Sequence, residues 1–390
     1  MAANAGPDII EDGIVFYYDT GNTVKSYIGE PTTNQFTNSN FTNGTTGWTF
    51  GSWDGGRYLY SVENVLGPFG EIVPALKITR TSSDTSYAHF HQYNSGKYSN
   101  GNTYTLSAYV KGAGTLGQYN QGGFTPLNYN PGQFVTLNST WQRVDYTLSS
   151  QTDSNYPYWA AENITQNVPM YFVFAQSELK THPTQYTPSS RSATQGLLDM
   201  VRTSTINIAN ASFDNNAQIE FDGTNDYTDS GYDLSWNNTN SVSIEFMIKP
   251  YNLSGGGIMG KEYPNWEWAF YQSGTNLNLV YWNNAGGHSN GMDFQVNVFP
   301  TSNTWYHITY TWDTTTSIFY VNGTAAGSKV AVDPSINQNR SNNVMIGGHT
   351  YVWADSYFNG KLDLVKYYNK ALTASEVLTN YNALKTRFGI

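Results

Sequence analysis

Short segments of alternating apolar and polar residues recur along almost the whole chain, separated by turns rich in Gly, Asn and Asp. A period of two places apolar side chains on one face of a strand and polar side chains on the other. Many such strands with turns at short spacing favour antiparallel β-sandwiches. The clearest segments are residues 13–19, 103–112, 141–149, 168–176, 241–250, 305–313 and 317–323. A chain of 390 residues is long enough for two sandwiches, each with its own core.

The composition supports an all-β fold. Aromatic residues make up 16% of the chain and charged residues only 12%, so residues that suit strands outnumber the usual helix formers. The chain has no cysteine, so neither disulfides nor thiolate metal sites can stabilise the two cores. Each sandwich must therefore be stable through packing alone.

Two local signals define the ends of elements. Near the C-terminus, Thr373 and Glu376 form a capping box before an apolar stripe, and Gly389 follows it, which predicts one short helix. Asn322 and Gly323 lie between two apolar runs, and both tolerate a positive φ. This pair predicts a type I′ hairpin.

The charge and the N-terminal segment exclude several partners. The net charge is −10 with a pI near 5.0, and Lys and Arg do not cluster as binding to a phosphate backbone requires. Residues 1–13 lack the basic start and apolar core of a signal peptide, and no run approaches the roughly 18 apolar residues of a membrane helix. We therefore expect no nucleic acid partner, no membrane insertion and no conventional secretion.

The C-terminal half contains an ordered series of motifs. The strand AQIEFDG at residues 217–223 is followed by NDYTDSG, SVSIEFMIKP, WYHITYTWD, IFYVNG, VMIGGH and FNGKLDLVKYYNKALTASEV. This order resembles the laminin-G-like, concanavalin A-like jelly rolls. The resemblance implies a fold but not a function, because such folds host many tasks.

A second series of motifs occupies residues 34–187. An Asn/Phe-rich opening leads to Gly47 and Trp48, followed by a strand at Tyr104 to Lys111 and another that begins at Trp141. The order resembles β-jelly-roll carbohydrate-binding modules grouped with xylanases and glucanases. It implies a second β-sandwich.

The join between these regions suggests an insertion. Residues 13–29, GIVFYYDTGNTVKSYIG, resemble the opening strand of laminin-G-like proteins of bacteriophage particles, in which the FDG strand normally follows within a few tens of residues. Here the continuation begins only at about Ser192. We therefore expect residues 31–190 to be inserted in a surface loop of a domain formed by residues 1–30 and 191–390. The alternative is two domains in tandem.

The ionisable residues give little support for catalysis. Jelly-roll glycosidases need two carboxylates on one strand about 5 Å apart, and no Glu-x-Asp-x-x-Glu run occurs. Glu262 and Glu267 are predicted to lie on a solvated loop. His89 and His91 alternate on one strand face, which we interpret as a polar face, and no histidine has metal-ligand spacing. We expect no enzymatic activity.

The stretch QIEFDGTNDYTDSG at residues 218–231 could hold a cation or form a turn. Calcium prefers several carboxylate and carbonyl oxygens, which loops rich in Asp, Gly and Asn supply. The resemblance to laminin-G-like jelly rolls implies a structural calcium held by Asp222, Gly223 and Asp363. In the alternative reading, Asp222 caps backbone amides of a sharp turn.

Aromatic clusters are the candidate carbohydrate sites, because aromatic faces stack on the apolar side of sugar rings. The predicted cluster in the inserted region is Trp48, Trp53, Tyr58, Tyr156, Tyr158 and Trp159, and that in the outer domain is Tyr263, Trp266, Trp268, Tyr281 and Trp282. Two alternatives remain open. Some of these residues could fill the cores, and an exposed patch could equally bind another protein.

We therefore predict a non-enzymatic structural protein of a bacteriophage particle, assembled in the host cytoplasm and displayed on the virion as a capsid decoration or tail-fibre component. Its expected partners are other virion proteins and a host-surface glycan, and self-association is a further option. Residues 1–13 are the candidate anchoring arm. The rival interpretation is a secreted bacterial glycan-binding or glycoside hydrolase accessory protein.

Overall fold

The structure is a computed structural model. It describes residues 9–390, with gaps at 53–55, 84–87, 93–97, 100, 121–133, 149–156, 215, 236–239, 262–266, 282–293, 331–341 and 350–355. For a few strand residues it describes the backbone but not the side chain, namely 52, 118–120, 148, 157, 158 and 349.

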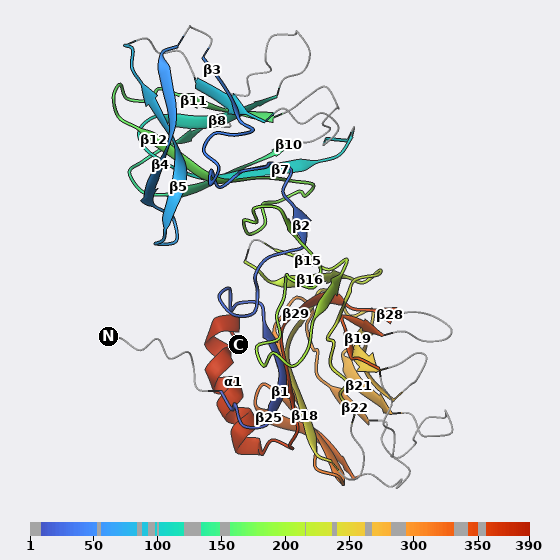
Figure 1. Cartoon of the computed structure of the whole chain (residues 1–390). Helices are drawn as coiled ribbons and strands as arrows, with labels where there is room; N and C mark the ends of the chain where they lie inside the picture. Colours follow the sequence, from blue (N-terminus) through green and yellow to red (C-terminus); the bar gives the residue numbers. More distant parts are fainter. Residues whose placement is uncertain are drawn as a thin grey trace. The chain divides into compact units, whose positions relative to one another are not determined.

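The chain divides into two compact units (Figure 1). The outer unit runs to Pro31 and resumes at Ser192, and the inserted unit is Thr32–Arg191. Each boundary lies one residue from the position expected from the sequence. Strand pairing gives the same division, because β1 (Ile14–Asp19) pairs with β29 (Asn359–Tyr368) near the other end of the chain.

The two segments that begin and end the inserted unit are adjacent strands. Thr32–Thr33 (β2) pairs with Ser190–Arg191 (β13), so the chain leaves and returns at the same place. Just outside this ladder, the backbone N–H of Ile28 donates to Gly196 O at 2.9 Å. A loop whose ends lie together can accept an inserted domain without disturbing the host sheet.

The outer unit contains an eight-stranded antiparallel sheet, in which β16 and β1 pair with successive parts of the same edge of β29. The strands along its main path are β15 (Ser212–Phe213), β16 (Ile219–Asp222), β29, β18 (Val242–Pro250), β23 (Tyr306–Trp312), β24 (Thr316–Val321) and β25 (Thr324–Val330). Most residues of β18, β23 and β29 are buried, since both faces of this sheet are covered.

A seven-stranded sheet covers one face of the first sheet. Its strands, in spatial order, are β14 (Asn207–Ala209), β17 (Tyr227–Asp229), β26 (Met345–Ile346), β19 (Gly256–Lys261), β20 (Trp268–Ser273), β21 (Asn276–Tyr281) and β22 (Phe294–Asn297). The short strands β27 (Gly348–His349) and β28 (Ser356–Tyr357) pair beside it. Large aromatic and branched side chains fill the space between the sheets, so this unit is a jelly-roll sandwich.

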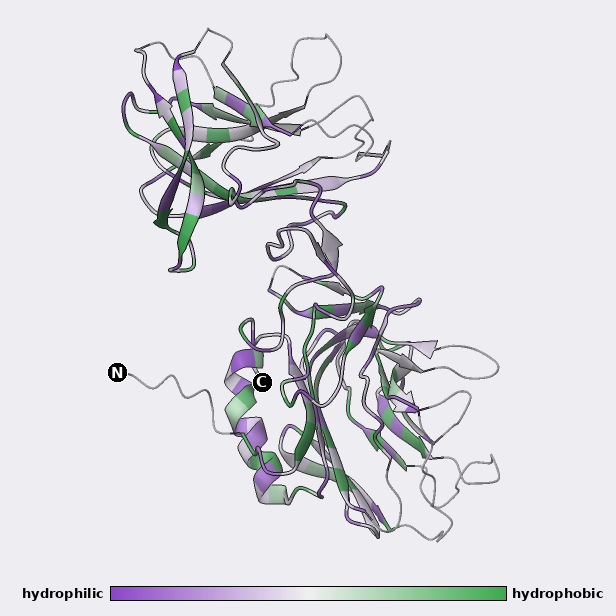
Figure 2. Cartoon of the chain, in the orientation of Figure 1, coloured by the Kyte–Doolittle hydropathy of each residue, from purple (hydrophilic) through white to green (hydrophobic). Residues whose placement is uncertain are grey.

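Helix α1 (Ala374–Phe388) lies alongside β1 and β18 and packs on the opposite face of the eight-stranded sheet (Figure 1). Figure 2 shows hydrophobic and hydrophilic bands alternating along this helix. Leu384 and Phe388 pack on Tyr17, Met247 and Leu364 of the sheet. No described helix has the length and apolarity needed to cross a bilayer.

The predicted ends of two elements are confirmed. The Thr373 side chain accepts from the Glu376 backbone, and the Glu376 side chain accepts from the Thr373 backbone, which is the expected capping box. Gly389 has φ of 70° and ends the helix. Asn322 and Gly323 have φ of 49° and 76°, and they connect β24 to β25 as the type I′ turn requires.

A buried polar network joins α1 to the sheet. The Glu245 carboxylate accepts from Lys366 Nζ at 3.0 Å, and its Oε1 lies 3.1 Å from His307 Nε2. Asn380 of α1 donates to the same carboxylate at 2.6 Å and accepts from the Ile10 N–H at 2.7 Å. Burial alone would raise the pKa of Glu245, but Lys366 and His307 lower it to about 2. The network therefore keeps Glu245 charged and ties the helix to the sheet.

The inserted unit is a second sandwich of two five-stranded sheets. The first sheet has the order β10 (Gln142–Leu148), β7 (Tyr104–Lys111), β12 (Met170–Glu178), β5 (Ile72–Arg80) and β4 (Tyr58–Leu66). The second has the order β3 (Thr49–Ser52), β6 (Ala88–His91), β11 (Pro157–Glu162), β8 (Thr115–Asn120) and β9 (Val135–Thr136). Its core is separate from that of the outer unit. The prediction of an all-β chain with two sandwiches and one C-terminal helix is confirmed.

Candidate functional site

The aromatic residues predicted as a carbohydrate site in the inserted unit are mostly part of its core. Trp48, Tyr58 and Trp159 are 7%, 5% and 0% exposed. Trp48 stacks on Phe41, and Trp159 packs edge-on against Phe172. These three residues fill the volume between the sheets and cannot present a ring to a ligand, so their assignment to a sugar site was wrong.

The remaining predictions for this cluster fall mainly outside the described residues. Trp53 and Tyr156 lie in the gaps. Tyr158 belongs to strand β11 by its backbone, and its side chain is outside the description.

The outer unit gives a similar result. Trp268 is 0% exposed and its Nε1 donates to Leu234 O at 2.9 Å, so it belongs to the core and its assignment to a sugar site was also wrong. Tyr281 is buried as well. Tyr263, Trp266 and Trp282 lie outside the described residues.

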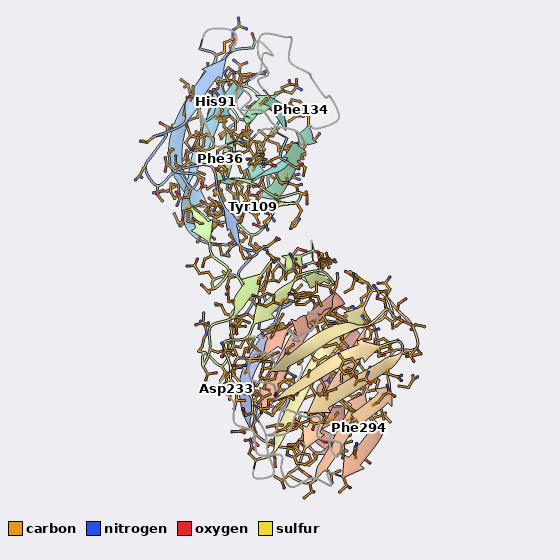
Figure 3. All side chains as sticks on the ribbon, turned by 90° about the vertical axis from the view of Figure 1, so that its right-hand side faces the viewer. Phe36, His91, Tyr109, Phe134, Asp233 and Phe294 are labelled. Carbon is orange, nitrogen blue, oxygen red and sulfur yellow. The ribbon has the colours of Figure 1, made fainter. Side chains whose placement is uncertain are left out.

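Glu267 is not on a solvated loop as predicted. It is the residue before β20 and is fully buried. Its carboxylate accepts from Lys261 Nζ at 2.9 Å and from the Ser235 hydroxyl at 2.9 Å. The lysine also pairs with Asp233, whose position is labelled in Figure 3. A buried ion pair at the end of a core explains this carboxylate without catalysis. Glu262 lies outside the described residues.

The predicted calcium ligands do not meet. Asp222 pairs with Asn359 across the ladder between β16 and β29, and Asp363 is four positions further along β29. At about 3.3 Å per residue, the two aspartates are roughly 13 Å apart along the strand. Calcium ligands lie within 2.6 Å of the ion, so Asp222, Gly223 and Asp363 cannot form one site. This ligand set was wrong.

Asp222 instead organises the turn after β16. Its side chain accepts from the Thr224 N–H at 2.7 Å, its backbone N–H donates to Asp226 Oδ2 at 3.0 Å, and Gly223 has φ of 79°. Both Asp222 and Gly223 are exposed. The alternative reading, a capped turn between two strands, therefore describes this stretch. No group of three or more His, Cys, Asp or Glu side chains suited to a metal occurs among the described residues.

Asp363 is a buried carboxylate with one oxygen satisfied. It is 0% exposed, and its Oδ1 accepts from the Ile219 N–H at 3.0 Å. Its Oδ2 has no hydrogen-bond partner. Burial raises the pKa of Asp363 to about 8, and Lys361 and Arg387 offset this shift only in part. Much of the Asp363 population is therefore protonated at neutral pH.

A group of partly exposed aromatic residues lies on the inserted unit, on the outer face of the sheet β10-β7-β12-β5-β4. Along β7, Leu106, Ala108 and Val110 belong to the core, whereas Tyr109 points to the opposite face. Buried Val73, Ala75 and Val173 form the base of this outer cluster. We call this surface the aromatic face, and its aromatic members are Phe69, Tyr109, Trp141, Tyr171 and Phe174.

Strand register places a row of alternating cations and rings across the aromatic face. Lys111 is opposite Tyr171, and Tyr171 is opposite Lys77. The Lys111 ammonium lies 4.6 Å from the ring centroid of Trp141 and 5.5 Å from that of Tyr171. These distances are typical of cation–π contacts. Lys77 pairs with Glu63 at 2.6 Å, and burial followed by this carboxylate raises the pKa of Tyr171.

A second row lies beside the first. Arg143 is opposite Tyr109, and its guanidinium lies 6.0 Å from that ring. Phe69 lies in the turn between β4 and β5, and its side chain extends across the sheet. Its ring centroid is 5.1 Å from that of Tyr109 and 6.0 Å from that of Phe174. Phe69 remains 63% exposed. Tyr109 is labelled in Figure 3, apart from Phe36 of the core.

Two structural features position these rings. Phe174 has φ of 56°, and the register between β12 and β7 shifts at this point, so an irregularity in β12 turns its side chain to the outer face. The indole N–H of Trp141 donates to Leu66 O at 2.8 Å, which ties the start of β10 to the β4–β5 hairpin. The rings are thus held by backbone contacts before any ligand binds.

The other sheet of this unit carries the predicted polar face. His89 and His91 lie on the same side of β6 with their rings 6.1 Å apart. Burial and, to a smaller extent, His89 lower the pKa of His91 to about 4. Both histidines are therefore neutral at physiological pH, and neither supplies a charge to a ligand.

The aromatic face was not predicted from the sequence, although a signal was present. In TYTLSAYVKG, the alternation that makes Leu106, Ala108 and Val110 inward residues also makes Tyr109 and Lys111 outward residues. An aromatic residue at an outward strand position exposes apolar surface, and a neighbouring cation can contact its ring. Searching the outward positions for rings would have found this surface.

Comparison with known families agrees with the architecture of the outer unit. Residues 222–378 match the model of the concanavalin A-like lectin/glucanases superfamily. This part of the chain is a concanavalin A-like, laminin-G-like jelly roll, as the ordered motifs predicted. A search of curated proteins returned no match.

Among solved structures, receptor-binding domains of botulinum neurotoxins are similar to part of the chain. The binding domain of neurotoxin DC, solved in complex with rat synaptotagmin II, is 16% identical with a TM-score of 0.41, and half of each chain is covered. The type G receptor-binding domain is 19% identical with a TM-score of 0.39, covering 49% of each chain. The C/D mosaic domain is 12% identical with a TM-score of 0.37, covering 48% of each. The chain thus spans about half the length of these structures.

Proposed function

We propose that the protein is a non-enzymatic adhesion protein of a bacteriophage particle, in which the aromatic face of the inserted sandwich binds a glycan of the host surface. The concanavalin A-like outer unit would serve as the scaffold that displays the inserted unit. In this proposal the protein is located on the virion, as a capsid decoration or tail-fibre component, and its neighbours are other virion proteins.

The aromatic face is the observation that carries the proposal. Sugar-binding surfaces need flat rings for the apolar side of the sugar and polar groups at their edges for the hydroxyls. Tyr109, Trp141 and Tyr171 supply partly exposed rings on one sheet face. Glu63 and Lys77 at the end of the first row supply a charged acceptor and donor. Tyr109, Tyr171, Glu63 and Lys77 lie in strands, and Trp141 directly precedes β10, so the groups of this surface are preorganised for binding.

A shallow face of this kind predicts weak binding at a single site. Multiple copies on one particle would convert that weak affinity into strong attachment, because each further contact is effectively intramolecular. This property suits a protein displayed in many copies. It also explains why the site needs no deep pocket.

The absence of catalysis is part of the proposal. Among the described buried carboxylates of the outer unit, Glu245 pairs with Lys366 and Glu267 pairs with Lys261, whereas Asp363 accepts one backbone hydrogen bond from Ile219. Glycoside hydrolysis by a retaining mechanism requires two carboxyl groups about 5 Å apart that face one substrate. Carboxylates that are committed to buried lysines are poorly suited to that task.

A glycan array with the full-length protein tests the binding. We expect binding to a subset of glycans and no hydrolysis of the same panel. Tyr171→Ala should weaken binding by about tenfold, which corresponds to about 1.4 kcal/mol. Tyr251→Ala, which removes a 37% exposed tyrosine of the outer unit, is the matched control and should bind normally. Turnover of any glycan would contradict the proposal, as would full binding by Tyr171→Ala.

The location on a particle needs its own experiment. Mass spectrometry of purified phage particles should detect the chain in stoichiometric amounts with the capsid or tail proteins. Cryo-electron microscopy of the same particles would then show to which component it belongs. Absence from purified particles would refute the virion assignment while leaving glycan binding open to the array.

A further inference from the structure

We propose that the aromatic face selects carboxylated glycans, that is, chains containing uronic or sialic acid residues. This inference rests on the proposed glycan-binding function and names the ligand class of the same site. Lys111 and Arg143 are the residues that would bind the carboxylates. The aromatic rings beside them would stack on the sugar rings.

These two cations lack carboxylate partners among the described residues. Lys111 contacts the rings of Trp141 and Tyr171 and donates to Leu66 O at 3.4 Å. Arg143 lies over Tyr109 and donates to Thr184 O. Neither forms an ion pair with any described carboxylate, whereas their neighbour Lys77 pairs with Glu63. The positive charge at this end of the face is therefore available to an anion.

The net charge of the inserted unit differs from that of the rest of the chain. Lys and Arg balance Asp and Glu within residues 32–191, so the whole net charge of −10 resides in the outer unit. Lys111 and Arg143 therefore remain unpaired cations on one face of a neutral sandwich, and the exposed Asp145 on the same side of β10 forms an ion pair with neither.

The spacing of the two cations also suits a carboxylated sugar. Arg143 is opposite Tyr109, and Lys111 is two residues from Tyr109 on the same face of β7, so the two cations are diagonal neighbours. Diagonal neighbours on adjacent strands lie about 7–8 Å apart at their backbone positions. The aromatic rings lie between and beside them. This arrangement suits a sugar whose ring stacks while its carboxylate is turned toward a cation.

The chemistry of the groups favours a carboxylate over a phosphate. A planar guanidinium can bind either a carboxylate or a phosphate with two parallel hydrogen bonds, and Arg143 offers its remaining Nη donors, because Nη2 already donates to Thr184 O and Nε is buried. The choice between the two anions therefore rests on the sugar ring that carries the charge. A uronic acid carries a single charge on a ring with an apolar face, which fits one cation beside one aromatic ring. A phosphodiester places its charge between sugars and offers no planar group beside the stacked ring.

Isothermal titration calorimetry with the full-length protein tests the proposal. The probes are oligosaccharides of alginate, polygalacturonate and hyaluronan, each compared with its carboxyl-reduced, neutral form. A teichoic acid fragment is the phosphate-bearing competitor. The double variant Lys111→Gln/Arg143→Gln is compared with the wild type and with Lys25→Gln, which removes an exposed positive charge from the outer unit. Thermal unfolding establishes that each variant is folded.

The proposal predicts that at least one acidic oligosaccharide binds at least tenfold more tightly than its reduced form. Lys111→Gln/Arg143→Gln should abolish this difference, Lys25→Gln should preserve it, and raising the salt concentration should reduce it. Equal binding of acidic and reduced forms would refute the carboxylate selectivity but leave the glycan-binding function intact. Stronger binding of teichoic acid would refute the choice of carboxylate. No binding to any probe would also refute the selectivity, and the glycan array would decide the underlying function separately.

Discussion

Replacement of Asp363 by Asn should stabilise the outer unit at neutral pH. The carboxylate is fully buried, and only its Oδ1 has a hydrogen-bond donor, the Ile219 N–H. Asn retains that acceptor and is never charged. The substitution therefore removes the cost of ionising a buried acid without removing its one hydrogen bond.

The size of the expected stabilisation follows from the pKa of Asp363, which burial raises from 3.8 to about 8. A native pKa above the unfolded value means that the folded state binds the proton more tightly. The free energy of unfolding is therefore highest below pH 4 and falls as the pH rises toward 8. At about 1.4 kcal/mol per pH unit, the loss at pH 7 is on the order of 4 kcal/mol.

Scanning calorimetry at pH 4, 5, 6, 7 and 8 provides the assay. The difference in stability between Asp363→Asn and the wild type should be near zero at pH 4 and should grow steadily toward pH 8. Asp222→Asn, at an exposed carboxylate, is the control and should show no such growth. A pH-independent difference would refute the reasoning. A destabilised Asp363→Asn that also lost a stabilising response to calcium would restore the metal-ligand interpretation.

The remaining predictions concern the cores and one turn. Glu245→Gln should lower the stability of the outer unit by about 3–5 kcal/mol, because it leaves Lys366 buried without its charged partner. Since the native pKa of Glu245 is about 2, the stability that its charge contributes is complete above pH 4.5 and is lost as the pH falls toward 2. Urea unfolding at several pH values would show this loss. Trp159→Ala should cost the inserted unit about 3–5 kcal/mol in the same assay, and a neutral effect would contradict its place in the core. Gly323→Ala should lower the free energy of unfolding by about 1–2 kcal/mol, because Gly323 has φ of 76° and an added Cβ would lie 2.9 Å from Tyr381 Cδ1. An unchanged melting temperature would argue against this turn. EDTA should leave the melting temperature unchanged if Asp222 and Asp363 act as described, and a decrease would indicate a bound cation.

The parts of the fold that could be predicted depend on local chemistry. The capping box at Thr373 and the turn at Asn322 require only neighbouring residues, so the sequence predicts them to the residue. The join near residues 31 and 191 could be predicted because two halves of one motif series were separated. Long-range pairing then brings Ile14 opposite Tyr368.

The site could not be predicted in the same way, because exposure depends on which face of a strand is covered. Trp48 and Trp159 belong to the core, whereas Tyr109 and Trp141 lie on the aromatic face. Aromatic content alone does not separate these groups. Only the register of β7 with β10 and β12 shows which rings share a face with the cations.

The metal prediction failed for a related reason. Asp222 and Asp363 both belong to motifs of the outer jelly roll, but ligation requires that they approach one ion. The ladder between β16 and β29 places Asp222 opposite Asn359, and Asp363 beside Ile219 near the other end of β16. The spacing of Asp222 and Asp363 in the sequence does not show how far apart the two carboxylates lie in the folded sheet.

The central claim is that a glycan occupies the aromatic face of the inserted unit. The most direct test is a crystal structure of the full-length protein with an oligosaccharide that the array selects. We expect sugar rings stacked on Tyr109, Trp141 or Tyr171, with polar contacts to Lys111 or Arg143. A sugar bound on the His89 face of the other sheet, or on the outer unit, with the aromatic face empty would contradict the account.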